Sequence, residues 1–208
     1  TGNAQIEGFT YHVPGDCSSA AFPLAAALIT GSALTLTNID LNDPQGDKEL
    51  FYILQRMGAS IKIDEKEKKI DVKEGSILSG IRVDLNSCID ALPILAVVAC
   101  FAKGETHIYN AAVARGKESD RLSCMTKELK KMGADIVETS DGLIIKNSIL
   151  HGAVVHSHED HRIAMALAVA GMAASGETVI SSVACVAKTF STFVDDFRAL
   201  GANIEVSV

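Results

Sequence analysis

The sequence predicts an α/β lobe in which apolar helices are enclosed by small sheets, and three observations support this fold class. First, residues 22–29, 93–101 and 163–173 are apolar on nearly every side, and a helix that is hydrophobic all round has to be buried. Second, short segments such as 34–37 and 204–206 alternate apolar and polar residues, which is typical of strands that are wet on one face. Third, the same order of elements recurs three times.

Two sets of glycines mark this repeat. Gly31, Gly104 and Gly176 follow the apolar helices and lie 73 and 72 residues apart. The second set follows the amphipathic helices at intervals of 75 and 68 residues, and consists of Gly58, Gly133 and Gly201. Two sets of glycines that each recur at a nearly constant interval indicate a true internal repeat. We expect one lobe over residues 1–208, with repeats at approximately 15–74, 85–147 and 156–208.

Each copy contains the same elements in the same order. After a lead at 6–13, the first copy has an apolar helix at 20–29, a strand at 34–37, an amphipathic helix at 50–57 and a strand at 61–63. In the second copy these elements are expected at 91–102, 106–109, 122–132 and 136–137. In the third they are expected at 163–174, 179–180, 193–200 and 204–206. Equivalent helices in related copies run in parallel, so their starts are expected to converge at one end.

Composition limits the class of protein. With 48% hydrophobic and 5% aromatic residues, the core of this 208-residue chain must be built from aliphatic side chains and alanine. A net charge of −7 argues against nucleic acid or an anionic membrane surface as a partner. The apolar runs are too short to span a bilayer. Nothing at the start of the chain is typical of a targeting peptide, and because Thr1 is not methionine we expect an excised or processed piece.

The five cysteines are an odd number without a Cys-x-x-Cys pair, at Cys17, Cys88, Cys100, Cys124 and Cys185. Their mostly apolar neighbours favour buried free thiols over disulfides, zinc ligands or a catalytic cysteine. This cysteine usage predicts a cytoplasmic protein.

Residues 115–121 concentrate three cations and two carboxylates in an otherwise acidic chain. If a helix begins near Glu118, Lys117 and Arg121 lie on one side of its first turn, where like charges repel unless an anion lies between them. A helix start also attracts an anion, and Glu118 would lie beside it as a candidate proton carrier. The alternative is a solvated, charge-mixed helix start.

Charged residues elsewhere stand at equivalent places in the repeat. Under approximate threefold symmetry, the residues brought to one rim are Asp90, Glu118, Arg121, Arg162 and Lys188. Lys188 has apolar neighbours, and a lysine in apolar surroundings usually needs an anion.

Each of these residues also has a structural interpretation. Asp16 and Asp90 could be simple helix N-caps, and Arg162 could pair only with Asp160 or Glu159. His158 and His161 could bind a metal, but no third ligand stands with them, so we expect no metal.

Several of these motifs together resemble one family. They are Gly15-Asp16-x-Ser18-Ser19, Asp90 before an Ala-rich helix, Lys117-Glu118-Ser119-Asp120-Arg121, Asp160-His161-Arg162-x-Ala164-Met165 and Ala187-Lys188-Thr189-Phe190. In this order the chain resembles the second lobe of the 5-enolpyruvylshikimate-3-phosphate (EPSP) synthase family over essentially its whole length. The resemblance implies an inside-out α/β barrel lobe of three βαβαββ repeats. It also implies that most of the first lobe is absent. In the family, a short segment from the N-terminus of the complete protein also completes the second lobe.

The resemblance further implies roles for seven residues. Asp90 resembles the carboxylate that contacts the target hydroxyl of shikimate 3-phosphate and acts as base, and Glu118 the carboxylate that moves a proton at the methylene carbon of phosphoenolpyruvate. The residues that resemble substrate-binding positions are Lys117 for shikimate 3-phosphate, Arg121, Arg162 and Lys188 for phosphoenolpyruvate, and His161 near the pocket. Two positions depart from the family, because Ile89 replaces a common proline and Val113 replaces a polar residue that often touches shikimate phosphate.

The implied activity is enolpyruvyl transfer from phosphoenolpyruvate to the 5-hydroxyl of shikimate 3-phosphate, without a metal or cofactor. The implied protein partner is the missing N-terminal lobe, and the chain alone is expected to be inactive. Two alternatives remain: a UDP-N-acetylglucosamine enolpyruvyl transferase, and a non-catalytic anion-binding module of the same fold.

Overall fold

The computed structural model describes residues 2 and 7–207, so Thr1 and Ile6, the first residue of the expected lead, lie outside the described residues. The α-helices of the described part are α1 (Cys17–Thr30), α2 (Glu49–Arg56), α3 (Leu92–Phe101), α4 (Arg121–Lys131), α5 (His161–Ala173) and α6 (Phe193–Ala199). Its 3-10 helices are η1 (Gly46–Lys48), η2 (Asn86–Ala91), η3 (Ala112–Gly116) and η4 (Val183–Lys188). Its strands are β1 (Leu34–Thr37), β2 (Ile61–Asp64), β3 (Lys69–Val72), β4 (Arg82–Asp84), β5 (Glu105–Tyr109), β6 (Ile136–Glu138), β7 (Leu143–Lys146), β8 (Val154–His156) and β9 (Val179–Ser181).

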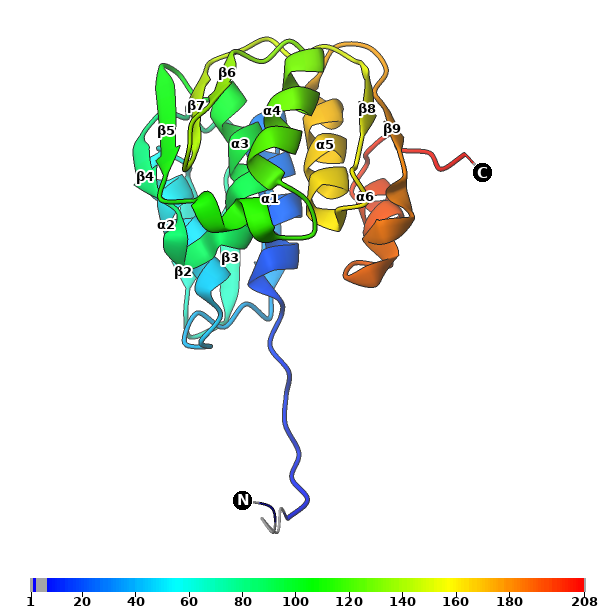
Figure 1. The fold of residues 1–208 in the computed structure, drawn as a ribbon. Helices are drawn as coiled ribbons and strands as arrows, with labels where there is room; N and C mark the ends of the chain where they lie inside the picture. Colours follow the sequence, from blue (N-terminus) through cyan, green and yellow to red (C-terminus); the bar gives the residue numbers. More distant parts are fainter. Residues whose placement is uncertain (1, 3–6, 208) are drawn as a thin grey trace.

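Helices α1, α3 and α5 lie side by side at the centre of the molecule (Figure 1), and each packs against the other two. In α3, every residue from Leu92 to Cys100 is buried. Burying one leucine, isoleucine or valine side chain stabilises the fold by about 1.5–3 kcal/mol, so a helix of this composition has no side that water could cover. The prediction that these helices are enclosed is confirmed for α3, while Ile29 of α1 and Ala168 and Met172 of α5 are only partly buried.

Three small sheets surround the central helices (Figure 1). The first has the order β1-β3-β2 and is antiparallel, and the second has the order β4-β5-β7-β6, with β4 parallel to β5. The third consists of β8 and β9 in parallel, with Val155 paired to Ile180. Burial alternates along β3 and β4, which agrees with sheets that have one wet face.

The strand expected at 204–206 is wrong, because residues 202–207 form no strand after α6. In the other two sheets, β3 or β7 lies between its neighbours and pairs with both. Within the described part of the chain, residues 202–207 pair with no strand. Beside this segment, β9, α5, η4 and α6 enclose a groove of about 990 Å³ whose lining includes Val186, Phe190 and Ile204.

Two further observations concern the cysteines and the length of the helices. All five cysteines are free, as expected, but Cys124 and Cys185 are only partly buried. Among the described residues, no helix is both long enough and apolar enough to cross a membrane.

Candidate functional site

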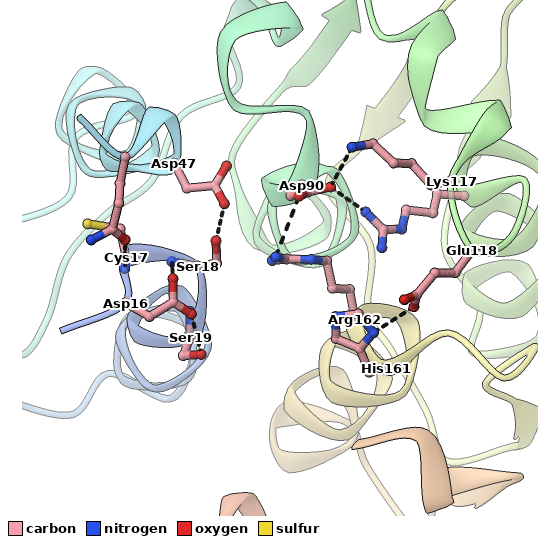
Figure 2. A network of polar contacts seen from close by, with 12 residues as sticks. Asp16, Cys17, Ser18, Ser19, Asp47, Asp90, Lys117, Glu118, His161 and Arg162 are labelled. Carbon is pink, nitrogen blue, oxygen red and sulfur yellow. Dashed lines mark hydrogen bonds and ion pairs between the residues drawn. The ribbon is translucent and has the colours of Figure 1, made fainter. Parts of the chain in front are cut away.

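The structure brings the predicted site residues together at the end of the molecule where α3, α4 and α5 begin, and Figure 2 labels Asp90, Lys117, Glu118, His161 and Arg162 there. Asp90 is in η2, directly before α3, and Arg162 is the second residue of α5. Lys117 and Glu118 lie between η3 and α4. Residues far apart in the sequence meet here because α3, α4 and α5 all begin at this end of the molecule.

Asp90 is the centre of a group of cations. Its Oδ1 accepts a hydrogen bond from Arg121 Nη1 at 2.7 Å and lies 3.2 Å from Lys117 Nζ. Its Oδ2 lies 3.5 Å from Arg162 Nη2. Three cations from different segments therefore surround one carboxylate, whose side chain is partly open to solvent. Clustered Lys and Arg side chains of this kind bind phosphate and carboxylate groups strongly.

A buried ion pair holds Arg121 in place. The Arg121 side chain is only 2% exposed, and its Nε donates to Oδ2 of the fully buried Asp160 at 2.7 Å. Ser119 Oγ donates to the same oxygen at 3.1 Å. Asp160 also accepts from the backbone N of Arg162 and caps α5. The Asp160 carboxylate thus fixes both the guanidinium of Arg121 and the helix that carries Arg162.

Glu118 is the centre of a second group of contacts. Its Oε2 lies 2.6 Å from His161 Nδ1, and its Oε1 accepts from Lys188 Nζ. One oxygen of Glu118, one of Asp160 and a ring nitrogen of His161 all lie within 4.8 Å of one another, so the two groups adjoin. These three could supply metal ligands, but Asp160 and Glu118 already accept hydrogen bonds from Arg121 and Lys188.

The reasoning that placed Lys188 among apolar neighbours is wrong. Its side chain is 63% exposed, and Ala187 is exposed as well. The Lys188 ammonium group donates a hydrogen bond to Glu118 on another segment. The contact with Glu118, and not apolar surroundings, therefore accounts for the position of Lys188.

The helix expected to begin near Glu118 begins at Arg121 instead. Asp120 is its N-cap, because its side chain accepts from the backbone N of Ser123 at 3.1 Å. Arg115 Nη1 donates to Asp120 at 2.9 Å and to Glu138 at 2.6 Å. These bonds hold residues 117–120 as a loop between η3 and α4, so Lys117 and Arg121 meet at Asp90 without sharing a helical turn.

The N-cap alternatives are resolved in opposite ways. Asp16 is a cap, since its carboxylate accepts from the backbone N atoms of Ser18 and Ser19. Asp90 is not, because α3 has no side-chain cap and the Asp90 oxygens face the cations instead. The pairing of Arg162 is also decided, because its guanidinium faces Asp90 while only its backbone N bonds to Asp160.

The three carboxylates are held in their ionised forms. Burial alone would raise the pKa of Asp90, but Arg162, Arg121 and Lys117 outweigh it and hold the pKa below its ordinary value. For Asp160, burial is likewise outweighed by Arg121. For Glu118, burial is outweighed by Lys188 and His161, which lower the pKa.

These lowered pKa values predict an acid-sensitive fold. A carboxyl group whose pKa is lower in the folded state stabilises the protein above its unfolded pKa, about 4, and this contribution is lost as the pH falls through the folded pKa. We therefore expect the melting temperature to drop below about pH 4. The drop should be smaller in Asp160→Asn, which has already lost one of these contributions. Thermal melts from pH 7 to pH 3 would measure it, and equal drops in both proteins would contradict this account.

A polar cluster at the start of α1 was not assigned a role from the sequence (Figure 2). Ser18 Oγ donates to Asp47, and burial raises the pKa of Asp47 despite that bond and the nearby Arg162. The sequence did contain a signal, because Gly15-Asp16-x-Ser18-Ser19 precedes the first apolar helix just as Asp90 and Asp160 precede the other two.

The two departures from the family pattern occupy different environments. Val113 lies in η3 with 59% exposure, while Ile89 packs against the core. Neither side chain has a polar atom, so neither adds a hydrogen bond at the rim.

Solved structures of enolpyruvyl transferases share this α/β fold. The solved structure of the enolpyruvyl transferase NikO from Streptomyces tendae matches with a TM-score of 0.76 over 93% of this chain and 44% of that chain. At 19% identity this likeness shows the fold alone. The solved structure of EPSP synthase from Acinetobacter baumannii matches with a TM-score of 0.85 and 37% identity, over 94% of this chain and 48% of that chain.

The chain belongs to the EPSP synthase family. The family model described as EPSP synthase (3-phosphoshikimate 1-carboxyvinyltransferase) matches residues 1–197. The protein named 3-phosphoshikimate 1-carboxyvinyltransferase from Chlamydia pneumoniae is 50% identical over 206 residues, which are 98% of this chain and 46% of that protein. The protein of the same name from Ruminiclostridium cellulolyticum is 50% identical over 205 residues, 99% of this chain and 48% of that protein. The chain thus spans about half the length of these curated relatives, and the predicted family membership is confirmed.

Proposed function

We propose that this chain is the second lobe of a two-lobed 3-phosphoshikimate 1-carboxyvinyltransferase. The complete protein would transfer the enolpyruvyl group of phosphoenolpyruvate to the 5-hydroxyl of shikimate 3-phosphate and release phosphate. The observation that carries the proposal is the group of Arg121, Lys117 and Arg162 around Asp90, all within 3.5 Å. Both substrates are phosphorylated carboxylates, and this is the chemistry that such a group of cations recognises.

In the proposed reaction, Asp90 takes the proton of the 5-hydroxyl as its oxygen attacks carbon 2 of phosphoenolpyruvate. Carbon 3 receives its proton through Glu118, which is ionised at rest and would pass on a proton of the Lys188 ammonium group that its Oε1 contacts, beside His161. The resulting tetrahedral adduct then loses phosphate, and a proton leaves carbon 3 to restore the double bond. Arg121, Arg162 and Lys188 would hold the phosphate and carboxylate of phosphoenolpyruvate, and Lys117 would contact shikimate 3-phosphate.

The contacts around Asp90 connect binding to chemistry. A carboxylate whose pKa is lowered by three cations is a weak base. An anionic substrate that engages Arg121 and Arg162 offsets their charge, so the pKa of Asp90 should rise toward its ordinary value. The base would then gain strength only when phosphoenolpyruvate is present, which favours proton transfer in the complete complex.

We further propose the finer architecture of the family, an inside-out α/β barrel lobe with repeats at 15–74, 85–147 and 156–208. The missing first lobe would close over the rim. A segment that precedes this chain in the complete protein would pair with the open edge of β9, beside the groove of about 990 Å³. The five free cysteines agree with a cytoplasmic setting.

The test is phosphate release by the two-lobed protein with phosphoenolpyruvate and a choice of acceptors. We expect release with shikimate 3-phosphate and none with UDP-N-acetylglucosamine, in line with the family match. Release with only UDP-N-acetylglucosamine would favour the alternative of a UDP-N-acetylglucosamine enolpyruvyl transferase. Absence of release with both would indicate a non-catalytic anion-binding protein.

We expect the isolated chain to release no phosphate, because the half that completes the shikimate 3-phosphate site and excludes water is missing. The same assay on residues 1–208 measures this, with Lys188→Ala in the isolated chain as the background control. Turnover by the chain above that control would contradict the proposed division of the site between two lobes.

A further inference from the structure

A buried acidic residue outside the rim contacts the segment that leads into α5. Glu128 lies in α4 and is fully buried, with 0% exposure. Its Oε2 accepts from the backbone N of His156 at 3.0 Å and from Lys131 Nζ at 2.6 Å. Its Oε1 lies 2.9 Å from His158 Nε2. A buried carboxylate is costly unless it is paired and hydrogen-bonded, and here two of three partners belong to residues 156–158.

Glu128 acts on this segment as an ionised acceptor. Burial alone would raise its pKa, but Lys131, His158 and the backbone N of His156 outweigh it and hold the pKa below the ordinary value. His156 accepts at Nδ1 from the backbone N of His158 at 2.7 Å, so its proton is on Nε2, which lies 3.2 Å from Ser182 Oγ. The two histidines and Glu128 therefore form one connected set of hydrogen bonds.

The segment that they hold has an unusual backbone. His158 and Glu159 have φ values of 55° and 59°, in the left-handed region that residues other than glycine seldom adopt. Ser157, which is fully buried, bonds through Oγ to Ser182 O and accepts from the backbone N of Glu159. Two consecutive left-handed residues persist only where surrounding contacts hold them. The next three residues are Asp160, His161 and Arg162.

Helix α4 contacts this segment at two points. Arg121 pairs with Asp160 at the rim, and Glu128 contacts His156 and His158 farther along. Residues seven apart lie on the same side of a helix, about 10 Å from each other along its axis. Helix α4 therefore contacts both ends of the bend, with Arg121 at the rim and Glu128 outside it.

We propose that Glu128 is a positioning residue for the rim, which acts by holding the left-handed bend at His158 and Glu159 and so sets the placement of Asp160, His161 and Arg162. The kinetic part of this proposal rests on the proposed function. Loss of the contact should misplace Arg121 and Arg162, which are assigned to phosphoenolpyruvate, more than Lys117, which is assigned to shikimate 3-phosphate.

Three variants of the two-lobed protein test this. Glu128→Met keeps the volume and removes both acceptor oxygens, while Glu128→Gln keeps one acceptor. His158→Asn tolerates a left-handed backbone but is too short to reach Glu128. Lys131→Gln is the matched control, because it removes a Glu128 partner without touching the bend.

We expect the KM for phosphoenolpyruvate to rise about tenfold in Glu128→Met, since small misplacements of binding groups have effects on the order of 10–100-fold. The KM for shikimate 3-phosphate should stay within about twofold. His158→Asn should behave in the same direction, Glu128→Gln should fall between, and Lys131→Gln should match the parent. A lowered melting temperature with both KM values unchanged would overturn the proposal, as would a Lys131→Gln protein that behaves like Glu128→Met.

The crystal structure of the Glu128→Met protein decides the matter independently of the substrate. We expect the bend to relax and the 2.7 Å contact between Arg121 and Asp160 to lengthen. If that contact and the two φ values are unchanged, the proposal is wrong. If the parent protein fails to release phosphate but the bend relaxes in the Glu128→Met protein, the proposed function is wrong and the positioning by Glu128 stands.

Discussion

Asp90→Asn in the two-lobed protein should lower the rate of phosphate release by about 10²- to 10⁴-fold, the range expected for loss of a positioned general base. The amide keeps the shape of the side chain and can still accept hydrogen bonds from Arg121 and Lys117. It cannot take the proton of the acceptor hydroxyl. The loss should therefore appear in kcat, measured at saturating concentrations of both substrates.

Asp195→Asn is the matched control for this change. Asp195 is an exposed residue of α6 and makes only a long contact with Arg198. The same exchange there should leave kcat unchanged. If Asp90→Asn kept more than about a tenth of the parent kcat, the loss would be too small for a positioned general base. Asp90 would then serve only to arrange the cations.

The second large effect is on stability. Asp160→Ala should destabilise the folded protein by about 3–5 kcal/mol, because removing one partner of a buried ion pair leaves the other charge uncompensated. Arg121 is 2% exposed and would keep only Asp90, while α5 would lose its N-cap. For a lobe of this size, such a loss should lower the melting temperature by about 6 °C or more.

Differential scanning calorimetry of the two-lobed protein measures this effect, with Asp195→Ala as the control that should leave the midpoint unchanged. Asp160→Asn should lie between, since an amide still accepts the hydrogen bond from the backbone N of Arg162. A midpoint within about 1 °C of the parent for Asp160→Ala would show that Arg121 is adequately held by Asp90 and by water.

Much of the fold could be predicted from the sequence, because hydrophobic pattern decides which surfaces must be buried. The all-round apolar character of 93–101 left α3 no alternative to the centre of the lobe. The alternating strands identified sheets with one wet face. The expected strand at 204–206 failed because a strand also requires a neighbour to pair with, and alternation within one segment carries no information about that neighbour.

The candidate site was predictable only in outline. The convergence of helix starts predicted that Asp90, Arg121 and Arg162 would meet, and they do; their roles remain predictions. A helix start near Glu118 was wrong because Asp120 is the N-cap, and its carboxylate is held there by Arg115, which also contacts Glu138. These are contacts between segments, which local sequence does not encode.

Glu128 is the clearest case of information that the sequence lacked. It stands between Lys127 and Lys131 in an amphipathic helix, where a glutamate is ordinarily solvated. Only the placement of β8 alongside α4 buries it and gives it His156 and His158 as partners. Asp47 is similar, because its burial results from the packing of η1 against η2.

We infer that the cations around Asp90 and Glu118 hold phosphoenolpyruvate in the complete protein. A crystal structure of the two-lobed protein with phosphoenolpyruvate bound tests it most directly. We expect phosphate and carboxylate oxygens within about 3 Å of Arg121, Arg162 and Lys188, with Asp90 released from at least one guanidinium. Phosphoenolpyruvate bound away from these three side chains, with the contacts of Asp90 unchanged, would contradict it.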